Sequence, residues 1–160
     1  MPFLSQTLRG VKQSAIRLMS RECRRVGGIN LAQGLCDLPV PEILQAAVNR
    51  AMAEGHNIYT FPEGCQELRE AIARKLARDN AIEADPDNEI VVTVGVTGAY
   101  ASTLRALLNP GDGILVMEPY YGYHVHIAKV AGLEPHMLKL NLPDFALPGR
   151  HRLPAPEIFS

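Results

Sequence analysis

The sequence lacks an excess of charge of either sign, and it lacks any apolar run long enough to cross a membrane. Sixteen Lys and Arg residues oppose seventeen Asp and Glu residues, giving a net charge of −1, so no basic surface for nucleic acid is indicated. Neither nucleic acid nor a membrane is therefore expected as a partner. The three cysteines, Cys23, Cys36 and Cys65, form no CxxC pair and no zinc pattern. They predict a reduced, cytoplasmic protein without a metal site.

Composition predicts one globular domain, with 47% apolar and 21% charged residues in a chain of 160. The first twenty residues contain Arg9, Lys12 and Arg17 but no acidic residue. That composition is typical of an organellar transit peptide. It is equally typical of an amphipathic helix, which we favour over residues 8–25.

Helical periodicity continues beyond this segment. A helix is expected from Pro41 to a stop at Gly55, because proline suits a first helical position and glycine suits the residue after the end. Residues 66–80 predict a second helix with an apolar stripe on one face. We expect Arg69 on its opposite, polar face, and Glu70 and Arg74 as a favourable pair four residues apart.

The pattern from residue 89 onwards alternates strand and helix. Apolar strands are expected at 89–94, 114–117 and 134–140, and helices at 99–108 and 120–131. Continuous apolar strands separated by helices predict an α/β fold with a mostly parallel sheet and right-handed crossovers. Residues 141–160 contain many prolines and no periodicity, which indicates an irregular tail.

The motif TVGVTGA at 93–99 has a strand, a glycine turn and a helix start. We expect the backbone N–H groups of Val96, Thr97 and Gly98 to bind a phosphate at the positive end of that helix. No Gly-Lys-Ser/Thr follows and the third dinucleotide-binding glycine is missing, so neither a P-loop nor a dinucleotide fold is indicated. The alternative is a turn that serves only to connect strand and helix.

The second motif is EPYYGYH at 118–124, which follows the next predicted strand. Ligands of open α/β sheets bind beyond the carboxyl ends of strands, so Tyr120, Tyr121 or Tyr123 could stack on a planar ring there. Alternatively, these tyrosines pack at the helix start with their hydroxyl groups in water. His124 and His126 do not have metal-ligand spacing.

Five motifs then occur in one order: INLAQG (29–34), NIYTFPEG followed by ELREAIA (57–73), EIVVTVGVTGAYAS (89–102), LLNPGD (107–112) and EPYYGY (118–123). The ordered set resembles the N-terminal segment of class I/II, fold-type I aminotransferases, which use pyridoxal phosphate. It is similar to the bacterial aspartate, methionine and kynurenine-type members.

The resemblance implies a cofactor, a reaction and a division of the chain. It implies amino transfer from an amino acid to a 2-oxo acid, in a homodimer, with pyridoxal phosphate. Residues 1–55 would form an N-terminal arm with helices, residues 56–140 part of the large cofactor-binding domain, and residues 141–160 the irregular tail.

The resemblance also implies roles for single residues. The loop at Gly34 would approach the substrate carboxylate, and Tyr59 would reach the cofactor phosphate of the partner subunit. Val96, Thr97 and Gly98 would bind the phosphate in the same subunit, and Tyr121 would stack on the pyridine ring.

The family's Schiff-base lysine has no matching position among Lys12, Lys75, Lys129 and Lys139. We therefore expect no catalytic residue in this chain, and a truncated or frameshifted product that is inactive alone. Two alternatives remain. One is a non-catalytic module that binds phosphate or pyridoxal phosphate or joins a dimer interface. The other is an incomplete, partly molten domain with exposed apolar surface.

Overall fold

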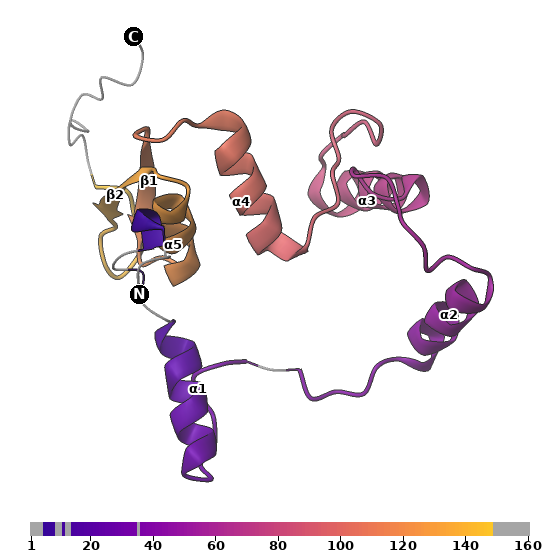
Figure 1. The fold of residues 1–160 in the computed structure, drawn as a ribbon, viewed down its shortest axis with the longest axis horizontal. Coiled ribbons are helices and arrows are strands. Elements are labelled where there is room, and N and C mark those ends of the chain that lie inside the picture. Colours follow the sequence, from indigo (N-terminus) through magenta and orange to yellow (C-terminus); the bar gives the residue numbers. More distant parts are fainter. Residues whose placement is uncertain (1–4, 9–10, 12–13, 35, 149–160) are drawn as a thin grey trace. The chain divides into compact units, whose positions relative to one another are not determined.

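A computed structural model describes residues 5–8, 11, 14–34 and 36–148 (Figure 1). Two compact units arise, one from Met1–Gln33 with Val94–Ser160 and the other from Gly34–Thr93. In chain order the elements are η1 (Gln6–Leu8), α1 (Ala15–Arg25), α2 (Glu42–Ala53), α3 (Gln66–Asn80), α4 (Gly95–Leu107), β1 (Gly113–Glu118), α5 (Gly122–Val130) and β2 (Glu134–Lys139).

The first unit is organised by a parallel pair of strands. β1 pairs with β2 from Gly113 opposite Glu134 to Glu118 opposite Lys139, and α5 forms the crossover between them. α5 ends at Val130, and Gly132 lies two residues beyond it with a φ of +84°. The N–H groups of Gly132 and Leu133 bond back to carbonyls of the last turn. The predicted α/β class and parallel pairing are confirmed.

The core of this unit lies where α4, α5 and the sheet meet. Leu104 is 5% exposed, Leu133 is 4% exposed and Ala128 is fully buried. Tyr100, Leu108 and Ile114 pack against them. The two helices are thus fixed to each other and to β1 by apolar burial, which is the main favourable term in folding.

The strand expected at 89–94 is absent from the described residues. Its backbone is irregular up to the start of α4, and the sheet contains β1 and β2 alone. A strand requires a neighbour to receive its N–H and C=O groups. The Val92 N–H bonds to the Glu63 carbonyl, at 2.9 Å, and the Glu89 N–H bonds back to the Asp85 carbonyl. In the described part of the chain, this β-favouring sequence therefore pairs with no strand.

Helix boundaries also differ from the expected ones. Of the N-terminal helix expected over 8–25, residues 15–25 form α1 and Leu8 ends a 3₁₀ turn at Gln6–Leu8, whereas residues 9–10 and 12–13 lie outside the described part. α4 begins at Gly95, four residues before the expected Ala99, because the Gly98 N–H already bonds to the Val94 carbonyl. Residues 141–148 of the expected tail close a turn through the Asn141 N–H and the Ala146 carbonyl, and residues 149–160 lie outside the described part.

The second unit contains α2 and α3. α3 spans the expected residues, and Arg74 and Glu70 pair at 3.8 Å on its surface. The placement of Arg69 on the polar face was wrong, since this residue is 6% exposed. Its guanidinium donates to Gln66 Oε1 and to the Pro86 carbonyl, at 2.6 Å from the latter. A buried charge needs such partners, and here they anchor the 85–89 loop to α3.

Gly64 lies against the segment that precedes α4. Its φ is +102°, and a Cβ placed on it would be 2.7 Å from the Val92 side chain. The neighbouring Glu63 carbonyl accepts the Val92 N–H. Only glycine combines this backbone angle with this approach, so Gly64 sets where the 56–63 loop meets residues 90–92.

Replacing Gly64 by alanine is expected to cost more than replacing Gly55. Gly55 also has a positive φ, +84°, but no atom lies within 4 Å of its added Cβ. Gly55→Ala should therefore lose about 1 to 2 kcal/mol from backbone strain alone, whereas Gly64→Ala should lose about 1 to 3 kcal/mol more from overpacking. Urea unfolding of both variants measures the difference. Equal losses would show that the contact with Val92 is not tight.

Candidate functional site

The N-terminus of α4 is open. Val94 and Val96 are 94% and 77% exposed, and no acidic residue lies in the first turn of the helix. A Cβ added to Gly95, whose φ is +65°, would meet no atom within 4 Å. The first N–H groups of any helix lack acceptors within it and carry its positive partial charge. The N-terminus of α4 therefore has the accessibility and the positive partial charge that suit a candidate anion-binding site.

One of the three expected phosphate donors is already engaged. The Gly98 N–H donates to the Val94 carbonyl at 3.3 Å, because α4 starts earlier than its glycines suggested. Val96 and Thr97 occupy the second and third positions of the helix, where the ladder supplies no acceptor. Thr97 is exposed and adds a hydroxyl group at the same place.

Tyr121 lies three residues after the end of β1 and forms the N-cap of α5, with a half-exposed ring. The rings of Tyr121 and His124 meet edge to face with centroids 5.7 Å apart. His124 in turn lies 5.1 Å from Tyr100 of α4. This row of rings joins the start of α5 to α4.

Tyr123 extends the row on the other side of Tyr121. Their ring centroids are 5.2 Å apart. The Tyr123 hydroxyl accepts a hydrogen bond from Arg17 Nε of α1 at 3.2 Å. The ring of Tyr123 thus packs at the helix start, as the packing alternative has it, but its hydroxyl bonds to α1, whereas that alternative placed it in water.

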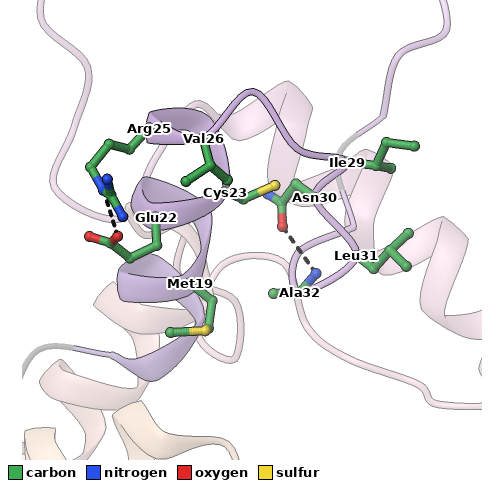
Figure 2. Close-up of a pocket in the computed structure, with 9 residues that line it drawn as sticks. All are labelled: Met19, Glu22, Cys23, Arg25, Val26, Ile29, Asn30, Leu31 and Ala32. Atoms are coloured by element: carbon green, nitrogen blue, oxygen red, sulfur yellow. Dashed lines mark hydrogen bonds and ion pairs between the residues drawn. The ribbon is translucent and has the colours of Figure 1, made fainter.

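The INLAQG segment is tied to α1. Asn30 Nδ2 donates to Ser20 Oγ at 3.1 Å, and Asn30 Oδ1 accepts the Ala32 N–H at 3.0 Å. Figure 2 shows the residues that line a pocket between this segment and α1. The pocket has a volume of about 370 Å³. Met19, Cys23 and Leu31 contribute to its lining, and no expected site residue does.

Gly34 and Tyr59 belong to the second unit. Gly34 is exposed, and a Cβ on it would meet no atom within 4 Å. Tyr59 is fully exposed, and Ile58 and Phe61 beside it are 79% and 74% exposed. The structure therefore brings residues 96–98 and Tyr121 into one unit, and Gly34 and Tyr59 into the other.

Three of the four lysines are described, and each is exposed on the surface of a helix or strand, as expected. Lys75 is on α3, where it donates to Asn80, Lys129 is in the last turn of α5, and Lys139 ends β2. Lys12 lies outside the described residues. Within the described part of the chain no helix has the length and apolarity to cross a membrane, and no three His, Cys, Asp or Glu side chains gather to hold a metal.

Comparison with known proteins identifies the family. The model of the aminotransferase class I and II family matches residues 26–146. The chain belongs to the aminotransferase class I and II family. It is 37% identical over 137 residues to a probable aspartate/prephenate aminotransferase of Thermus aquaticus, which covers 82% of this chain and 36% of that protein. It is 33% identical to the methionine aminotransferase of Escherichia coli, over 80% and 35% of the two chains.

Solved aminotransferase structures have the same fold over this segment. The N-succinyldiaminopimelate aminotransferase of Mycobacterium tuberculosis superposes with a TM-score of 0.81 at 32% identity, covering 88% of this chain and 36% of that one. An Escherichia coli methionine aminotransferase gives 0.82 at 31% identity, over 92% and 39%. The chain spans about a third of the length of its relatives, consistent with the N-terminal segment that its motif order indicates.

Tyr100 was missed by the sequence interpretation, and His124 was considered only as a metal ligand. The spacing of Tyr121 and His124 in the sequence could have indicated their contact. Tyr121 and His124 are three residues apart at a helix start, and side chains with this spacing meet on a helix. The proximity of Tyr100 depends on how α4 packs against α5, which periodicity within one segment does not define.

Tyr100 supplies a prediction about pH. Burial raises the pKa of its phenol above the ordinary value of 10.0, so the folded state retains the proton longer than the unfolded state. Its contribution to stability is complete below pH 10 and declines as the pH rises through the raised pKa. Tyr100→Phe should lose this alkaline decline in urea-unfolding midpoints. Tyr120→Phe, at an exposed tyrosine, should retain it, and identical profiles for the two variants would contradict the assignment.

Proposed function

We propose that this chain carries the phosphate- and ring-binding part of a pyridoxal phosphate site, in an aminotransferase that moves an amino group from an amino acid to a 2-oxo acid. The observation that supports this most is the arrangement in one unit of an open helix N-terminus and an aromatic N-cap after β1. A phosphate and a planar ring are the two recognition elements of pyridoxal phosphate. In this proposal the N-terminus of α4 recognises the phosphate, and Tyr121 recognises the ring.

The residues fit the cofactor's phosphate. Val96 and Thr97 offer amide groups at the positive end of α4, and the Thr97 hydroxyl adds a donor. Gly95 leaves open space beside them. Gly98 contributes chiefly by its lack of a side chain, because its N–H is engaged with Val94.

Tyr121 fits the cofactor's ring. It is half exposed, and its ring contacts the rings of Tyr123 and His124. When bound, pyridoxal phosphate supplies the electron sink that amino transfer requires. The work of this chain is to hold that group by its phosphate and its ring.

The remaining roles extend the proposal. Gly34 would let the substrate carboxylate approach the backbone, since its surroundings are open. Tyr59 would contact the cofactor phosphate of a partner subunit, because an exposed apolar loop such as residues 58–61 favours burial in an interface. The division at residues 55 and 140 and the cytoplasmic location also remain predictions. A non-catalytic module is not favoured, since the relatives are aminotransferases.

The phosphate role predicts opposite effects of one substitution on stability and on binding. Thr97→Asp adds a negative charge in the first turn of α4, which should stabilise the helix by about 0.3 to 1 kcal/mol. The same charge should repel the phosphate and weaken pyridoxal phosphate binding about tenfold, equivalent to about 1.4 kcal/mol. Absorbance titration and urea unfolding measure the two effects.

Thr103→Asp is the matched control, since Thr103 is an exposed threonine further along α4. It adds the same charge beyond the first turn and should change the affinity by less than about twofold, because charges near a helix end act within that turn. If both variants bind pyridoxal phosphate as tightly as the unmodified chain, the phosphate does not lie at α4.

The positions of the lysines predict that the 160-residue chain does not transfer amino groups by itself. Lys75, Lys129 and Lys139 lie on exposed helix and strand surfaces, whereas a lysine amine is activated by burial in a hydrophobic pocket or by a cationic group beside it. Methionine and a 2-oxo acid, incubated with the chain and pyridoxal phosphate, should give no turnover above that of the free cofactor. A full-length aminotransferase of the family is the positive control, and measurable enzyme-dependent turnover by the chain would refute the prediction.

A further inference from the structure

Tyr121 is the aromatic member of the proposed site, and its ring contacts the rings of Tyr123 and His124 without being buried. It precedes α5 as the N-cap and is 49% exposed. A ring on which a cofactor stacks loses less conformational entropy on binding if its orientation is already fixed. We therefore looked for a side chain that restricts the orientation of the Tyr121 ring.

His124 is placed to do this. Side chains on a helix lean towards the N-terminus, so a residue at position i covers the residue at i−3. The His124 ring accordingly meets the Tyr121 ring edge to face, with centroids 5.7 Å apart. The His124 N–H also donates to the Tyr121 carbonyl, at 2.9 Å.

The other side of His124 leads to the core. Its ring lies 5.1 Å from Tyr100, and Tyr100 packs on the cluster of Leu104, Ala128 and Leu133. Tyr100 is thus fixed by burial, whereas Tyr121 is not. His124 itself is exposed, and the buried residues of α5 are Val125 and Ala128. Its place on α5 is therefore explained by its two aromatic neighbours better than by core packing.

We propose that His124 is a positioning residue, which transmits the fixed orientation of Tyr100 to Tyr121 and so presets the ring on which pyridoxal phosphate stacks. This inference rests on the proposed function. It assigns His124 no contact with the cofactor. Its effect should fall on recognition of the ring and spare recognition of the phosphate.

The test compares four variants of the full 160-residue chain. His124→Ala removes the ring, and His124→Leu keeps apolar bulk without a ring. His124→Phe keeps an aromatic ring that can meet Tyr121 edge to face. His126→Ala is the matched control, because His126 lies on the same helix and contacts the ring of Tyr123.

The first readout is the NMR signal of the Tyr121 ring protons without ligand, assigned with Tyr121→Phe. His124→Ala and His124→Leu should shift and broaden these signals. His124→Phe should restore a single ordered environment, and His126→Ala should leave the signals near their original positions. A helix that is merely destabilised would not be rescued selectively by an aromatic residue.

The second readout is affinity for two probes, pyridoxal phosphate and inorganic phosphate. His124→Ala and His124→Leu should weaken pyridoxal phosphate binding by about threefold to tenfold, the equivalent of one aromatic pair. Binding of inorganic phosphate should be unchanged, and His124→Phe should recover most of the loss.

The outcomes separate the two proposals. If the Tyr121 signals are unchanged in every His124 variant, the positioning role is wrong. It is also wrong if His124→Leu preserves these signals to the same extent as His124→Phe. If the signals respond as expected but the unmodified chain shows no saturable binding of pyridoxal phosphate, the proposed cofactor site fails and the ring contact alone stands.

Discussion

The parallel pairing of β1 with β2 is the constraint on which the first unit depends. Parallel strands cannot be joined by a tight turn, so the chain must cross over through α5. The crossover buries Val125 and Ala128 and starts beyond the carboxyl end of β1. Tyr121 caps that start, so its position follows from the strand pairing, and α4 joins the arrangement through Leu104.

The glycine motif at 95–98 correctly predicted the start of a helix, but it misplaced the first helical residue. Glycine is permissive, so GVTG was expected to form a turn ahead of the helix. In the structure Gly95 takes its positive φ within the first turn itself, and the Gly98 N–H bonds to Val94. The open amides therefore move towards the N-terminus, to Val96 and Thr97. The prediction of an anion site is unaffected by this shift, because such a site belongs to the end of a helix wherever that end falls.

The sequence predicted an element correctly where its local signals agreed. It failed where the conformation depends on a contact with a segment distant in the chain. α3 matched its expected bounds because periodicity and polar flanks coincide there. The strand expected at 89–94 failed, since apolar β-branched residues form a strand only beside another strand. Arg69 was misplaced for a related reason. Besides Gln66 on the same helix, its partners are carbonyls of the 85–89 loop, seventeen or more positions away, and no periodicity along α3 reveals these.

The aromatic row explains why the candidate site is more ordered than its exposure suggests. Exposed loop tyrosines ordinarily sample several rotamers, and ordering one on binding costs free energy. Here the cost is met during folding, because burial of the Leu104 cluster fixes Tyr100, and contacts between rings extend that order through His124 to Tyr121. The same logic applies in the second unit, where Gly64 against Val92 fixes the base of the loop that carries Tyr59. In both cases a less exposed residue lies behind the exposed tyrosine without being shown to touch it, Tyr100 behind Tyr121 and Gly64 behind Tyr59. The residues that prepare a site therefore differ from those that touch its ligand, and motif searches centred on ligand contacts miss them.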